Sequence, residues 1–91
     1  MMKTFLIVYK LNDYGTYYSI ISEKIKSYGK WAKPFDRTWV VKTEKPAVDI
    51  RNELASVINR RGSILVVNIT GSAWATSQVN TSVNDWLHDN V

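Results

Sequence analysis

Three short runs of this chain carry apolar side chains on both alternate faces, as strands covered on two sides do. The runs are 5–11, 38–43 and 64–69. Successive side chains of a strand point to opposite faces, so Phe5 and Ile7 share one face while Leu6 and Val8 share the other. A chain of 91 residues has too few helices to coat both faces of a sheet. We therefore expect a second copy of the protein to cover one face.

The segments around these runs supply two amphipathic helices and a hairpin. Apolar residues recur at spacings of three and four over 16–28 and 46–59, which predicts helices that begin near Thr16 and Pro46. The hairpin begins with a short strand at 30–31 that is broken at Pro34. The other strands are expected over 3–11, 37–43 and 63–70. A terminal helix, capped by Thr81 or Ser82, is expected to follow an irregular segment at 72–76.

The order strand, helix, strand, strand, helix, strand predicts one ferredoxin-like domain over residues 1–91. Such a domain is an α+β fold: a four-stranded antiparallel sheet with both helices on one face. Residues 72–91 form a C-terminal tail with a short helix. Because the open face carries apolar residues, we expect a homodimer in which two sheets pack face to face, the tail crosses to the partner, or both.

Composition narrows the classes of function. Cysteine is absent, which excludes disulfides, thiolate nucleophiles and zinc sites that use cysteine. No apolar run is long enough to cross a membrane, and the chain enters its first strand without a signal-peptide pattern, so we expect a cytoplasmic protein. The net charge of +4 permits contact with RNA or DNA phosphates without requiring it.

Basic and aromatic residues alternate in one stretch of the chain. Trp31 lies between Lys30 and Lys33, and Arg60 and Arg61 are adjacent further on. These residues indicate either a solvated surface or a nucleic-acid-binding site in which the ring stacks on an unpaired base. Trp74 is a second candidate for stacking. Trp39 and Trp86 are expected in the core or an interface, and His88, the only histidine, at the surface.

Three polar side chains are expected on the open face or at strand ends, among apolar neighbours. Lys10 shares a face with Leu6 and Val8, Arg37 with Trp39 and Val41, and Asn68 with Ile64 and Val66. Polar groups in such surroundings need partners. They either satisfy one another across a dimer or contact a phosphate or base.

Several motifs resemble those of one family of small bacterial proteins. They are 9–12 (YKLN), 37–43 (RTWVVKT), 50–54 (IRNEL), 69–71 (ITG) and 84–87 (NDWL). The chain resembles the SinR-like or CRISPR-associated endoribonuclease-like family, which is similar to the compact CRISPR spacer-acquisition subunit and related to the VapD-type ribonuclease toxins. The resemblance implies a ferredoxin-like homodimer.

In the nuclease-like relatives, the first strand ends in an aspartate that is taken to hold a divalent metal, and Lys10 stands at that position here. A lysine repels a cation, so the expected protein has no metal site and no confident catalytic residue. It is a structural or nucleic-acid-associated module whose contacts would be Lys10, Lys30, Trp31, Lys33, Arg37, Arg60 and Arg61. One alternative is a ribonuclease dependent on Mg or Mn, with Asp13 as the carboxylate. The other is a protein interaction module that uses the open sheet edge or the tail.

Overall fold

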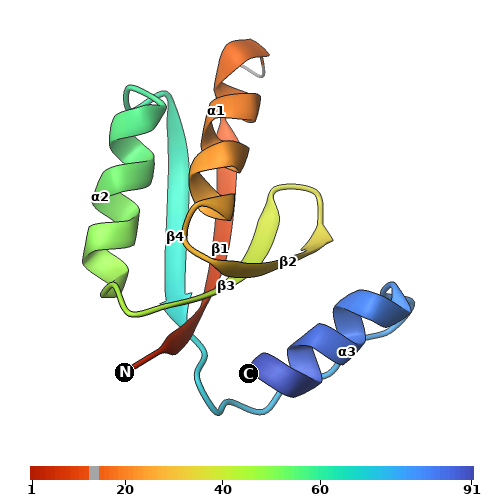
Figure 1. The fold of residues 1–91 in the computed structure, drawn as a ribbon. Coiled ribbons are helices and arrows are strands. Elements are labelled where there is room, and N and C mark those ends of the chain that lie inside the picture. The colour runs from red at the N-terminus through yellow and green to blue at the C-terminus, as the bar shows by residue number, and fades with distance from the viewer. Residues whose placement is uncertain (13–14) are drawn as a thin grey trace.

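A computed structural model, which describes residues 1–12 and 15–91, has the α+β fold with the predicted ferredoxin-like order and one further helix (Figure 1). The elements are β1 (Lys3–Leu11), α1 (Gly15–Lys26), β2 (Lys30–Phe35), β3 (Thr38–Thr43), α2 (Ala47–Val57), β4 (Gly62–Asn68) and α3 (Thr81–Asn90). Helices α1 and α2 pack against each other, and α3 lies apart from them, near β2.

The four strands form one antiparallel sheet in the order β2-β3-β1-β4. Strand β1 is therefore central, while β2 and β4 are the two edges. Ile7 on β1 lies opposite Trp39 on β3 and opposite Val66 on β4, which places these three side chains on one face. The register thus defines a helix-side face, covered by α1 and α2, and an opposite face.

The main core fills the space between the helix-side face and the two helices. Phe5 and Ile7 of β1 are buried there together with Val41 of β3. From the helices, Ile21 and Ile25 of α1 and Ile50 and Leu54 of α2 complete this layer. Each of these side chains is almost fully removed from water, which makes their burial the main stabilising contribution to the fold.

The prediction that Trp39, Val41, Ile64 and Val66 lie on the open face is wrong, because the register places all four on the helix-side face. Arg37 precedes β3 in the hairpin turn, where its φ of 59° interrupts the alternation of a strand. Asn68, the last residue of β4, lies opposite Phe5 on the helix side. Lys10 alone of the three polar residues follows the open-face pattern, opposite Ser63 and exposed.

The C-terminal tail of the same chain covers much of the opposite face. The sequence alone predicts that a second copy of the protein covers this face. Thr4, Ala32 and Val40 are buried on this face, and Leu87 of α3 is only 6% exposed. The Thr4 hydroxyl donates a hydrogen bond to the carbonyl of Asn90, at the end of α3. Leu65 and Val67 on β4 stay exposed, so the tail covers the side of β2 and β3 and leaves the outer side of β4 open.

Several element boundaries differ from the prediction, β3 beginning at Thr38 and β4 ending at Asn68. Strand β2 continues through Pro34 with a register shift between Ala32 and Phe35, because an edge strand tolerates a residue without an N–H. Helix α1 already includes Thr16, which therefore is not its cap. Asn80 caps α3 in place of Thr81 or Ser82, and its side-chain oxygen accepts from the Ser82 N–H at 2.9 Å.

Replacing Leu87 with alanine should destabilise the protein by about 2 kcal/mol or more, because the change leaves a cavity beneath α3. Urea unfolding followed by circular dichroism measures the free energy of unfolding. The control is Val48→Ala, at a side chain of α2 that is 49% exposed, which should change this free energy by less than about 0.5 kcal/mol. Equal effects of the two changes would show that α3 does not pack on the sheet in solution.

Candidate functional site

A groove of about 420 Å³ opens on the helix side of the sheet, between α1 and strands β2 and β3. We name it the aromatic-lysine groove, after the side chains that line it. The lining residues are Tyr18, Ser19, Ser22, Glu23, Lys26, Trp31, Lys33 and Trp39. Its volume falls within the range of small-molecule and single-nucleotide sites.

The strand register brings Trp31 and Trp39 together in the groove, and their rings make an edge-to-face contact. Trp31 on β2 lies opposite Val41, on the helix-side face, and Trp39 lies on the neighbouring strand. The ring centroids are 5.2 Å apart with an angle of 62° between the planes. Trp39 is 1% exposed and Trp31 is 39% exposed. Trp31 therefore offers an accessible ring held in place by a buried one.

Two lysine ammonium groups lie over the aromatic rings of the groove. Lys26 Nζ is 5.4 Å from the centroid of the Trp31 ring, and Lys33 Nζ is 5.1 Å from that of Trp39. Lys26 also lies 3.6 Å from a carboxylate oxygen of Glu23. A lysine ammonium group therefore lies over each ring of the tryptophan pair.

Tyr18 holds Lys33 in position through its hydroxyl group. Lys33 Nζ donates to the Tyr18 oxygen at 2.9 Å, and the Tyr18 hydroxyl donates to Asp36 Oδ1 at 2.6 Å. The hydrogen bond to Tyr18 is the main reason that the pKa of Lys33 is raised, and the hydrogen bond from Tyr18 is the main reason that the pKa of Asp36 is lowered. Both groups therefore stay charged at neutral pH.

Two buried polar atoms close to these groups have no hydrogen-bond partner among residues 1–12 and 15–91: the indole N–H of Trp39 and the hydroxyl of Tyr9. Trp39 lines the groove, and Tyr9 is close enough to Lys33 to contribute to its raised pKa. A buried donor without an acceptor costs about 1–3 kcal/mol.

The structure brings together two of the predicted contact residues, Trp31 and Lys33. Lys30 lies on the opposite face of β2, paired with Lys42, although it precedes Trp31 directly. Trp74, the other stacking candidate, contacts His88 of α3 at a centroid distance of 4.8 Å. The sequence interpretation missed Tyr18, Ser22 and Lys26, whose spacing of four residues puts them on one side of α1.

The remaining predicted residues lie outside the groove. Arg61 stacks over Tyr17 on α1 with 6.0 Å to the ring centroid, and its carbonyl accepts from the Asn12 N–H. Arg60 and Lys10 are both exposed. Arg60 lies just before the start of β4, and Lys10 lies near the end of β1, which pairs with that start. The carbonyl of Arg37 accepts from the Tyr9 N–H at 3.2 Å. Asp13, the candidate catalytic residue, is outside the described residues.

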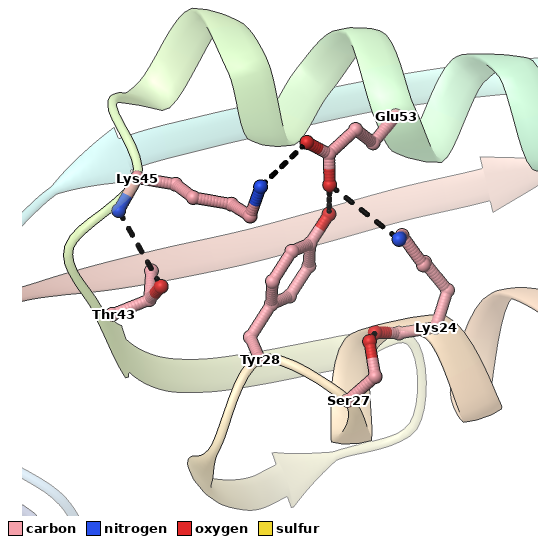
Figure 2. Close-up of polar contacts among 6 residues, drawn as sticks. All are labelled: Lys24, Ser27, Tyr28, Thr43, Lys45 and Glu53. Carbon is pink, nitrogen blue, oxygen red and sulfur yellow. Dashed lines mark hydrogen bonds and ion pairs between the residues drawn. The ribbon is translucent and has the colours of Figure 1, made fainter.

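A second polar cluster surrounds Glu53 on α2 (Figure 2). Its carboxylate accepts from Tyr28 at 2.8 Å and from Lys45 at 3.0 Å, and Lys24 Nζ lies 3.6 Å away. Burial raises the pKa of Glu53, but the hydrogen bonds from Lys45 and Tyr28 and the two lysine charges lower it by more, so it lies below its usual 4.5. Burial, followed by the bond to Glu53, raises the pKa of Tyr28.

The Glu53 cluster links three parts of the chain. It joins the end of α1, the loop before α2, and α2 itself. Among residues 1–12 and 15–91, no three or more His, Asp or Glu side chains gather in a way that would hold a metal ion. No helix in the same part of the chain is long and apolar enough to span a membrane.

Comparison with known proteins gives no relatives: no family model, no curated protein and no solved structure matches this chain.

The Glu53 cluster predicts a loss of stability at acidic pH. A carboxyl whose pKa is lower in the folded state stabilises the protein above its unfolded pKa, near 4.5, and this contribution disappears as the pH falls through the folded pKa. Glu53→Gln should therefore make the free energy of unfolding less dependent on pH below about 4.5. The control is Glu44→Gln, at a carboxylate that is largely exposed, which should keep the wild-type dependence. Identical pH profiles for Glu53→Gln and the wild type would contradict the assigned interactions.

Proposed function

We propose that this protein is a non-catalytic module that binds single-stranded nucleic acid in the aromatic-lysine groove. The proposal depends on one observation: the Lys26 ammonium lies over the partly exposed ring of Trp31, and the Lys33 ammonium lies over the Trp39 ring that packs against it. Proteins that bind single strands stack bases on aromatic rings and attract the backbone with positive charge. The groove offers both features within one site.

On binding, the Lys26 ammonium would leave the Trp31 ring and contact a phosphate of the nucleic acid. A base that stacks on Trp31 takes the place that the Lys26 ammonium occupies over the ring, and the flexible lysine then meets the adjacent phosphate. Lys33 has less freedom, because Tyr18 and Asp36 hold it. It would serve as a fixed positive charge near the base.

The other basic residues would contact the backbone of a longer strand. Arg61 lies on the side of α1 that faces away from the groove, against Tyr17. Arg37 lies in the hairpin turn directly after Asp36, which hydrogen-bonds to Tyr18 at the groove. With Lys10 and Arg60, these residues would add affinity without sequence preference. Lys30 does not belong to this surface.

The proposal assigns no catalytic step to the protein. Lys10 places a positive charge at the strand end where the nuclease-like family that the sequence resembles would hold a metal-binding aspartate. A cation there disfavours Mg²⁺ or Mn²⁺ binding. Cleavage of RNA in the presence of either metal, abolished by Asp13→Asn, would replace this proposal by the ribonuclease alternative.

Trp31→Ala should weaken the binding of a fluorescein-labelled uridine oligomer by about five-fold to a hundred-fold, because one base loses its stacking partner, worth about 1–3 kcal/mol. Fluorescence anisotropy with the RNA oligomer and with its thymidine DNA counterpart measures the affinity and compares the two nucleic acids. Affinity unchanged by Trp31→Ala for both oligomers, or no binding of either by the wild type, would exclude the groove as the binding site.

Lys26→Gln should reduce the slope of log affinity against log salt by about 0.7, the value for one phosphate contact to a single strand. Lys30→Gln is the matched control, since it removes the same charge from the opposite face of the sheet, four residues further along the chain. Both variants have the same net charge, so a general electrostatic effect would change both slopes equally. A smaller slope for Lys26→Gln than for Lys30→Gln would therefore indicate a phosphate contact within the groove.

A further inference from the structure

Strand β4 has a free edge that lacks the features by which proteins protect edge strands. Residues Gly62–Asn68 contain no charged residue and no proline, and the pairing with β1 has no register shift. The other edge, β2, has Lys30, Lys33 and Pro34, a register shift and a contact with α3. Charges, prolines and bulges on an edge prevent pairing with another chain, so only β4 is open to such pairing.

The apolar side chains of β4 are only partly covered on either face of the sheet. Leu65 is 58% exposed on the open face, and Val67 beside it is also exposed. Ile64 and Val66 point toward the helices but are only half-buried. With Val48 and Arg51 of α2 they line a depression of about 300 Å³ along the edge. A strand placed beside β4 would cover apolar side chains on both faces of the sheet.

The backbone groups of alternate residues point to this free edge. At the two ends of the β1–β4 ladder, Ile69 N–H donates to the Thr4 carbonyl and Asn12 N–H donates to the Arg61 carbonyl. Hydrogen-bonded pairs alternate along an antiparallel ladder, so residues 63, 65 and 67 bond inward to β1. The N–H and C=O groups of Gly62, Ile64, Val66 and Asn68 therefore point outward.

We propose that β4 pairs with β4 of a second copy of this chain, antiparallel and about a two-fold axis at Leu65. Leu65 is the middle residue of the seven, so this axis pairs the whole strand with itself. It places Ile64 opposite Val66 of the other copy, and both residues point their backbone groups outward, as a hydrogen-bonded pair requires. A partner strand of this kind matches the neutral edge in charge and shape, since each apolar residue meets another or Ser63.

The result is one continuous eight-stranded sheet with all four core helices on the same side. In this dimer the C-terminal tail of each copy covers its own sheet. In the homodimer expected from the sequence, the sheets pack face to face, the tail crosses to the partner, or both. The two aromatic-lysine grooves lie at the outer flanks of this sheet, roughly 34 Å apart for seven strand spacings of about 4.8 Å. The pairing itself does not depend on what the groove binds.

Single cysteines test the register, because the chain has no cysteine of its own. Across the proposed axis, Leu65→Cys brings two Cα atoms to about 4.5 Å, within the range for a disulfide. Val67→Cys is the matched control: it lies on the same face two residues away, but its two copies are separated by about 13 Å along the strand. Under a glutathione redox buffer, Leu65→Cys should shift from 10.5 kDa to about 21 kDa on a non-reducing gel, and Val67→Cys should not.

Light scattering of the wild type at micromolar to millimolar concentration should show a dimer, and circular dichroism should show both cysteine variants folded. Cross-linking of both cysteine variants to the same extent would indicate face-to-face packing and overturn the proposed register. A wild type that stays monomeric over the whole concentration range would overturn the pairing. A dimer in which neither variant cross-links would overturn it as well.

Discussion

Burial of the helix-side face of β1 is the constraint on which the other elements depend. β1 is central in the sheet, and Phe5, Ile7 and Tyr9 on this face are covered by side chains from both helices. Because β3 and β4 flank β1 and their helix-side residues join the same core, the register is fixed: a shift by one residue would turn every apolar side chain to the wrong face. The same register aligns Trp31 with Trp39 and separates Lys30 from Lys33.

The sequence predicted the order and type of the elements because each rests on a local pattern. Alternation predicted β1, and spacings of three and four predicted α1 and α2. The assignment of faces depends on pairing across the sheet, which alternation within one strand does not reveal. This is why Trp39 and Val41 were placed on the open face, and why a second copy was expected where Leu87 and Val40 pack within one chain.

Two residues of the candidate site, Trp31 and Lys33, were accessible to sequence reasoning. Trp31 and Lys33 are two residues apart on one strand, so a basic and aromatic cluster could be read directly. Tyr18 and Lys26 come from α1 and enter the groove only because that helix packs along β2 and β3. Likewise, the unpartnered N–H of Trp39 is a property of packing in three dimensions, and no sequence pattern indicates it.

The hydrogen bond between Thr4 and Asn90 has a topological consequence, because it brings the first strand and the last helix together (Figure 1). The two ends of the chain are neighbours, so a short linker could join them without disturbing the sheet. New ends could then be opened between α1 and β2 or in the segment before α3, giving a circularly permuted protein with the same core. The order in which the elements leave the ribosome would change, whereas the native contacts would not.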